Sequence, residues 1–135
     1  AERIKKAIGV AARPSSGDGK VLHIKGRDLL KGVPKEVVIN QRQIGEALEE
    51  PVQAIIEAVK NTLENSDPEL ASDIVDKGIV LTGGGSLLGE LDQVIRDATG
   101  LPVSIADDPL SCVVQGTGKC AENLKDLRSV LSSSY

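Results

Sequence analysis

The sequence predicts an α/β fold with a small α+β unit in its first third. Between residues 79 and 106, an apolar run, an amphipathic stretch and a second apolar run follow one another. A strand, a helix and a strand in this order form a parallel sheet. Earlier, two short stretches at residues 21–25 and 36–40 alternate between apolar and polar side chains. Their link is too long for a tight hairpin but suits an antiparallel pair.

The first third is expected to contain one helix besides these two strands. Apolar residues at helical spacing predict an opening amphipathic helix that reaches Ala11. The composition of residues 14–19, PSSGDG, predicts a loop. The alternation in the two strands places four side chains on buried faces, namely Leu22, Ile24, Val37 and Ile39.

Helical periodicity returns from Ile44 to Leu63. Pro51 is expected to open a new helix there or to kink the old one, because its ring clashes with the preceding turn. Asp67 and Pro68 are typical of the start of the next helix. The apolar run at residues 79–81 then predicts a buried strand.

Two more helices are expected towards the end of the chain. The first has its apolar face between Leu87 and Ala98 and is stopped by a glycine and a proline. A strand at residues 103–106 follows it. The second helix is expected to run from residue 112 to about residue 131, although Gly116 and Gly118 weaken it.

The composition argues against several classes of function. The 135 residues fit one domain, with or without a small appendage, and no apolar run approaches the ~20 residues that span a membrane. A net charge of −4 and a single aromatic residue, Tyr135, argue against a nucleic-acid partner, which needs a basic surface and stacking side chains. The absence of methionine, even at Ala1, indicates an excised piece of a longer protein.

The two cysteines are expected to be free thiols. Cys112 and Cys120 lie eight residues apart on a predicted helix, which separates their Cα atoms by ~12 Å along its axis. A disulfide requires less than ~7 Å. Free thiols fit a reducing cytoplasm. A metal site is not expected either, because the one histidine, His23, is distant in sequence and belongs on the solvent face of a strand.

Three consecutive glycines, Gly83, Gly84 and Gly85, stand where the strand at residues 79–81 gives way to a helix. Backbone N–H groups at the start of a helix favour a phosphate, and glycine lets a ligand approach the backbone itself. A valine at Gly84 is expected to block that approach and to oppose any positive φ. A tight turn with close helix–strand packing is the alternative, and the glycines alone leave both interpretations open.

A dinucleotide site is a second possibility for the same glycines. Gly83, Gly85 and Gly89 form GxGxxxG, one residue longer than the usual fingerprint, and Asp107 stands where a ribose-binding acid would follow the next strand. The rest of the chain offers no further β-α-β unit, which weakens this alternative.

Five ordered blocks of sequence carry a resemblance to a known family. On them, nearly the whole chain resembles the C-terminal half of the bacterial actins of the MreB family, within the actin, Hsp70 and sugar-kinase superfamily. The blocks are AERIK at residues 1–5, GVPKEVVIN at 32–40, PELASDI at 68–74, GIVLTGGGSLL at 78–88 and TGLPVSIADDPLSCVVQGTGK at 99–119.

The resemblance implies part of an actin-like ATPase lobe, which is ribonuclease-H-like. It makes residues 1–48 a small α+β subdomain, IIB, and residues 49–124 part of subdomain IIA, and it leaves a tail at 125–135. In IIA the last helix packs tightly, which would explain its two glycines.

The resemblance also implies a nucleotide site for ATP or ADP, with Mg²⁺ in the full-length proteins. By this analogy Glu2 contacts the ribose and Lys5 the adenine side, while Gly83, Gly84, Gly85 and Ser86 contact the adenosine and the nearest phosphate. From the residues alone, Glu2 and Lys5 share a helix face, since they are three positions apart. A solvated helix face is the alternative for these two residues.

The implied function is that of a cytoplasmic, cell-shape-determining filament protein. The family's phosphate loops and catalytic carboxylate belong upstream of Ala1, so this chain is expected not to be an enzyme and to bind nucleotide weakly or not at all. The implied partners are other copies, head to tail or as a dimer, and a membrane-anchored helix-turn-helix adaptor. Direct membrane contact is not expected. An oxidoreductase-type dinucleotide domain and a structural interaction module without ligand remain the alternatives.

Overall fold

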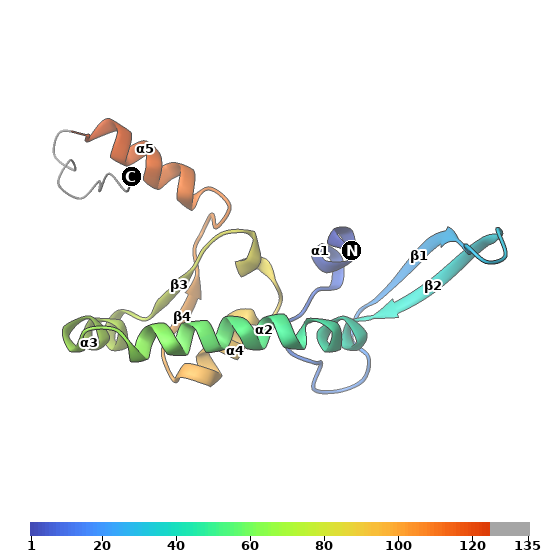
Figure 1. Cartoon of the computed structure of the whole chain (residues 1–135), viewed down its shortest axis with the longest axis horizontal. Helices are drawn as coiled ribbons and strands as arrows, with labels where there is room; N and C mark the ends of the chain where they lie inside the picture. The colour runs from blue at the N-terminus through green and yellow to red at the C-terminus, as the bar shows by residue number, and fades with distance from the viewer. Residues whose placement is uncertain (125–135) are drawn as a thin grey trace.

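The computed structural model describes residues 1–124. Figure 1 shows an elongated molecule built along one long helix, with a β-hairpin projecting at one end and the last helix standing away from the body. The predicted tail at 125–135 lies outside the described residues. The last helix ends at Glu122, with Asn123 as its C-cap, and so stops short of the predicted end near residue 131. The elements are α1 (Glu2–Ile8), β1 (Val21–Arg27), β2 (Pro34–Asn40), α2 (Gln41–Glu64), α3 (Pro68–Lys77), β3 (Ile79–Leu81), the 3-10 turn η1 (Gly84–Leu87), α4 (Leu91–Thr99), β4 (Val103–Ile105) and α5 (Cys112–Glu122).

Strands β1 and β2 form the predicted antiparallel pair, in register from Val21 opposite Asn40 to Arg27 opposite Pro34. The predicted burial is only partly correct. Leu22, Ile24 and Ile39 are half-buried, whereas Val37 is exposed. The reason is that the hairpin projects from the body, so much of its length has no second layer to cover it (Figure 1).

Helix α1 ends at Ile8. The prediction that this helix reaches Ala11 is wrong. The backbone becomes extended at Gly9, and Val10 then forms an isolated parallel bridge with Gly89. Ala11 is buried from this extended segment rather than from a helix. A strand-like contact with a distant part of the chain therefore replaces the last predicted helical turn.

Helix α2 begins earlier than predicted because Asn40 and Gln43 form a capping box. The Asn40 Oδ1 atom accepts from the Gln43 backbone N–H at 2.9 Å, and Gln43 Oε1 accepts from the Asn40 N–H at 3.1 Å. These bonds satisfy donors that a bare helix end leaves open. The helix continues through Pro51 to Glu64. Of the two alternatives predicted at Pro51, the start of a new helix is therefore excluded.

The core forms where α2 packs against α4 and the strand pair β3–β4. Strands β3 and β4 are parallel, with Ile79 opposite Val103, and this confirms the predicted β-α-β unit. Val80 is 59% exposed, however, so β3 is not the fully buried strand expected. In residues 1–124 its sheet has two strands, which leaves a face and the outer edges open. The buried cluster consists of Ala11, Val52, Ile56, Leu91, Ile95 and Val103.

Helix α5 is the least packed element. None of its residues is buried, and a Cβ added at Gly116 or Gly118 would meet no atom within 4 Å. Within residues 1–124 the expected tight packing at these glycines is not found, because no residue of α5 is buried and the space beside both glycines is open. Both cysteines are free, as predicted. No helix of the described part is long and apolar enough to cross a membrane.

Candidate functional site

The glycine turn between β3 and α4 is fixed by its first glycine. Gly83 has φ 78° and ψ 173°, a conformation that only glycine adopts without strain. Its N–H donates to the carbonyl of Pro109 at 2.7 Å. Its own carbonyl accepts from the Ser86 N–H at 3.2 Å and from the Ser86 hydroxyl at 2.7 Å. Gly83 therefore ties the turn to the loop after β4.

Gly84 and Gly85 are different, because nothing in residues 1–124 requires glycine there. Neither has a positive φ, so a side chain at either position would meet no strain from the backbone conformation. A Cβ at Gly84 would make an ordinary contact with Leu110 at 3.5 Å, and one at Gly85 would meet no atom within 4 Å. Close helix–strand packing therefore does not explain these two glycines. Their N–H groups also donate to no acceptor within the described chain.

Ser86 supports the turn from inside. Its residue surface is only 3% exposed, and its hydroxyl is held by the Gly83 carbonyl. A buried hydroxyl with a partner costs little and fixes its surroundings, whereas one without a partner would be destabilising. The structure thus gives Ser86 an internal role in shaping the turn.

The glycine turn does not open an α-helix directly, which corrects the prediction of a helix dipole at this point. The residues from Gly84 to Leu87 form one 3-10 turn. Glu90 then adopts a left-handed conformation, with φ 62°, and α4 begins only at Leu91. The polarity of the turn therefore comes from individual N–H groups and not from an aligned helix.

Glu2 and Lys5 share one face of α1, as predicted, and pair with each other. The Lys5 Nζ lies 3.0 Å from Glu2 Oε2, and Lys6 Nζ lies 3.6 Å from Glu2 Oε1. The hydrogen bond and charge of Lys5, with a smaller effect of Lys6, hold the pKa of Glu2 below its usual range. Both side chains of the Glu2–Lys5 pair are exposed, so they are accessible to a ligand or a partner.

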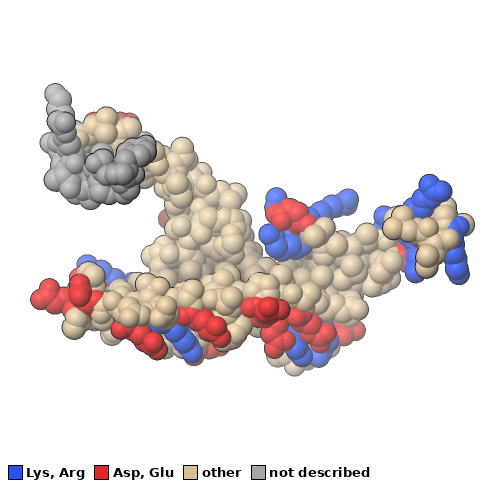
Figure 2. Space-filling model, viewed as in Figure 1, with Lys and Arg blue, Asp and Glu red and all other residues tan. Residues whose placement is uncertain are grey.

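Backbone hydrogen bonds connect the segment after α1 with the segment after the glycine turn. The Ala11 N–H donates to the Gly89 carbonyl at 2.7 Å, and the Gly89 N–H donates to the Gly9 carbonyl at 3.3 Å. Figure 2 shows an open notch between α1 and the part of the molecule that carries the strands β3 and β4. No hydrogen bond or ion pair of the described residues joins Glu2 or Lys5 to Gly83–Ser86.

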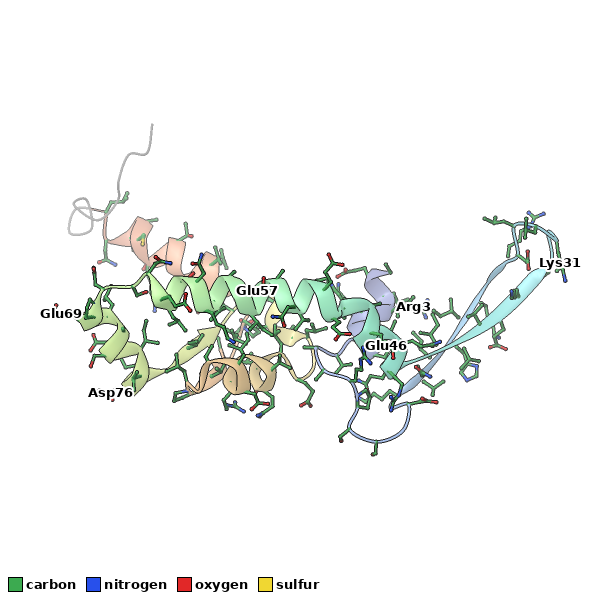
Figure 3. All side chains as sticks on the ribbon, turned by 60° about the horizontal axis from the view of Figure 1, so that its bottom comes forward. Arg3, Lys31, Glu46, Glu57, Glu69 and Asp76 are labelled. Carbon is green, nitrogen blue, oxygen red and sulfur yellow. The ribbon has the colours of Figure 1, made fainter. Side chains whose placement is uncertain are left out.

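A second hollow lies along α2, and its lining is acidic. Its volume is about 650 Å³. Figure 3 shows two of its residues, Glu46 and Glu57, on this helix. Like charges repel at short range, so this hollow does not suit a phosphate. The hollow is lined by Glu46, Glu49, Glu50, Gln53, Ala54 and Glu57.

The loop after β4 also shapes the glycine turn, and no sequence motif predicted this role. Pro109 accepts the Gly83 N–H through its carbonyl, and Leu110 borders Gly84. The signal for this loop was available, because the carboxyl ends of neighbouring parallel strands meet at one edge of a sheet. The residues ADDPL directly follow β4 in the way that TGGG follows β3.

Comparison with known proteins now identifies the family. The family model for MreB/Mbl protein matches residues 1–129. The chain belongs to the MreB/Mbl family. It is 48% identical over 122 residues to the cell shape-determining protein MreB of Escherichia coli K12, covering 90% of this chain and 35% of that protein. It is 42% identical over 106 residues to the cell shape-determining protein Mbl of Bacillus subtilis 168, covering 78% and 32% respectively.

Solved structures of the MreB/Mbl family agree with the fold. MreB5 of Spiroplasma citri bound to ADP superimposes with a TM-score of 0.81 at 35% identity, over 97% of this chain and 39% of that chain. MreB5 bound to AMPPNP gives 0.80 at 36%, over 95% and 38%. The actin-like fold class and the resemblance are thus confirmed. The dinucleotide-domain alternative finds no support. This MreB-like chain spans about a third of the length of the curated relatives it matches.

Proposed function

We propose that this chain contributes the adenosine side of an ATP- or ADP-binding cleft in an actin-like, cell-shape-determining filament protein. One observation carries the proposal. Gly84 and Gly85 have no steric or conformational reason within residues 1–124 to be glycine, and their N–H groups are free there. A ligand that approaches the backbone explains both facts. MreB5, which matches 97% of this chain, binds ADP in its crystal structure.

Each candidate residue takes a distinct role in this proposal. The N–H groups of Gly84 and Gly85 donate to the nucleotide, and Gly83 and Ser86 hold the turn in the shape that leaves those donors open. The Glu2 carboxylate accepts from the ribose hydroxyls, and Lys5 orients that carboxylate and faces the adenine. Hydrogen bonds to a carboxylate are charge-assisted and therefore stronger than neutral ones.

In this proposal, other parts of the full-length protein supply the metal site and the groups that hydrolyse ATP. No three acidic, histidine or cysteine side chains of residues 1–124 cluster as a metal cage requires, so this part supplies no complete Mg²⁺ site. The phosphate loops and the catalytic carboxylate are expected from other parts of the full-length family proteins, of which this chain spans about a third. We therefore expect no phosphate release from ATP by this chain above a buffer control, and release that is lost in Gly84→Val would contradict this.

The proposed architecture assigns residues 1–48 to subdomain IIB and residues 49–124 to subdomain IIA, with α2 continuous across the boundary. In this view other copies of the protein, in a head-to-tail filament or a dimer, and a membrane-anchored helix-turn-helix adaptor bind its outer surfaces. The protein would act in the cytoplasm. If the chain were a purely structural module without a ligand, the glycines at positions 84 and 85 would remain unexplained.

Saturation-transfer difference NMR of ATP with the chain tests this proposal, because the method detects weak ligands. The variant Gly85→Val projects a branched side chain into the open space in front of the turn without requiring a positive φ. We expect it to abolish transfer to the adenine and ribose protons. Gly116→Val is the matched control, since it also enters open space, on α5, and should retain the transfer. Equal transfer in wild type and Gly85→Val would contradict the proposal.

A further inference from the structure

An exposed leucine stands beside the glycine turn. Leu110 lies in the loop between β4 and α5 and is 68% exposed. Its Cδ2 atom lies 3.5 Å from the point where a Cβ would stand at Gly84. Outside Gly84 and its two chain neighbours, no other atom of the described chain comes within 4 Å of that point. Figure 1 shows the loop between β4 and α5 next to the turn that follows β3, in agreement with the hydrogen bond that joins them.

Hydrogen bonds of the backbone hold Leu110 in this place. The carbonyl of Pro109, its neighbour in the chain, accepts from the Gly83 N–H at 2.7 Å. On its other side, the Ser111 N–H donates to the Asp108 carbonyl at 3.2 Å. The backbone is therefore fixed while the side chain remains in water. A ligand that covers the leucine has only this side chain to order, which keeps the entropic cost of binding small.

The surface at the turn is polar and apolar at once. The N–H groups of Gly84 and Gly85 donate to no acceptor within residues 1–124, and Leu110 adds an aliphatic side chain next to them. A nucleotide has the same two parts, because its phosphates and ribose accept hydrogen bonds and the faces of its base are apolar. Aromatic side chains usually stack on a base, but residues 1–124 contain no Phe, Trp or Tyr. Here an aliphatic side chain has to take that place.

We propose that Leu110 packs against one face of the adenine of the bound nucleotide. The inference rests on the proposed function and adds a residue that neither the resemblance nor the glycine motif assigned. In this arrangement the N–H groups of the turn bind the polar part of the nucleotide, and the leucine covers the base. Contact between the two removes apolar surface of both from water, which is favourable.

The apolar face of α5 offers another reason for an exposed Leu110. Val113 and Val114 are 74% and 68% exposed, and they lie three and four positions after Leu110, the spacing of one helix face. Leu110 differs from them because it precedes α5 and is placed by the bond between Gly83 and Pro109. A variant at Val113 therefore separates the two explanations.

Saturation-transfer difference NMR with ATP tests the contact. Leu110→Ser is compared with Leu70→Ser, which removes a leucine of similar exposure, 55%, from α3. We expect Leu110→Ser to lower the transfer to adenine H2 and H8 relative to the ribose protons, and to weaken binding about tenfold. Leu70→Ser and Val113→Ser should behave like the wild type. Urea unfolding of each variant checks that its fold is intact.

Leu110→Trp tests the same contact through tighter binding. The chain has no tryptophan, so this variant carries a single fluorescent probe beside the turn. Because a base stacks well on an aromatic ring, ATP should bind at least about fivefold more tightly than to the wild type. ATP should also quench the emission, whereas inorganic tripolyphosphate, which lacks a base, should not. Leu70→Trp should be quenched by neither compound.

The outcomes distinguish this inference from the proposed function. If Gly85→Val removes the transfer seen in the wild type but Leu110→Ser keeps the full adenine transfer, the role of Leu110 is wrong and the cleft stands. Equal losses in Leu110→Ser and Val113→Ser would assign the leucine to the apolar face of α5 and would overturn the inference as well. If the wild type shows no transfer, both the inference and the proposed function are wrong.

Discussion

Val10 and Gly89 form a parallel bridge that joins two distant parts of the chain. Val10 belongs to the extended segment after α1, and Gly89 lies between the glycine turn and α4. A Cβ at Gly89 would lie 3.2 Å from the Gly9 carbonyl oxygen, so this glycine has a packing reason that Gly84 and Gly85 lack. The bridge fixes α1 relative to the glycine turn through the backbone, independently of any ligand.

The glycines of the turn should separate into structural and functional positions. Gly83→Ala should lower the free energy of unfolding by about 1–3 kcal/mol, because alanine is strained at φ 78° and ψ 173°. Gly85→Ala should leave stability nearly unchanged, because its Cβ enters open space. Urea unfolding followed by circular dichroism gives both values. Equal losses in the two variants would show that the turn is not held as described.

This contrast marks the limit of what the sequence alone predicts. The β-α-β unit and the antiparallel pair follow from local periodicity. The helix stop at Gly100 follows from a glycine with a proline shortly after it, and Gly100 has the left-handed φ, 71°, that such a stop requires. The bridge of Val10 with Gly89 does not, because no local pattern encodes a contact between segments so far apart. The hydrogen bond from the Gly83 N–H to the Pro109 carbonyl is of the same kind.

Burial was predicted less well than secondary structure, for a related reason. Alternation along a strand identifies its two faces, but only the tertiary arrangement decides whether a layer covers them. Val37 on the hairpin and Val80 on β3 are therefore exposed. Of the candidate site, the shared face of Glu2 and Lys5 was predictable from their spacing. The sequence predicted that the turn would expose backbone N–H groups, but it did not predict the 3-10 geometry that decides which of them are free.

Acid should weaken α1 through Glu2. The pKa of this carboxyl is lowered from 4.5, mainly by the hydrogen bond from Lys5. A lowered pKa in the folded state means that the stabilisation is complete above the unfolded pKa and is lost as the pH falls through the folded value. NMR titration of the Glu2 carboxyl carbon should therefore give a midpoint below 4.5. The α1 amide shifts should move towards coil values in the same pH range.

Two lysine variants are the controls for this titration. Lys5→Ala should return the Glu2 midpoint towards its ordinary value, and Lys6→Ala should change it less, because Lys6 lies at 3.6 Å rather than 3.0 Å. A midpoint that does not respond to Lys5→Ala would mean that the pair is not formed in solution.

The open edge of β3 should promote self-association of the isolated chain. In residues 1–124 this strand pairs only with β4, and unpaired strand edges recruit other chains. Sedimentation velocity should show dimers that increase with concentration, and Val80→Lys should reduce them because a charge on the edge strand opposes pairing. Val113→Lys, on the exposed face of α5, is the matched control. A strict monomer across a wide concentration range would refute this prediction.

Amide chemical shifts during an ATP titration test whether the glycine turn and α1 form one side of a nucleotide cleft, as proposed. We expect the amides of Gly83–Ser86 and of Glu2 and Lys5 to move together. Their common midpoint should lie no tighter than about millimolar, equivalent to ~4 kcal/mol, with little difference between ATP and ADP. If these amides stay still while a distant surface moves, the cleft assignment is wrong for this chain.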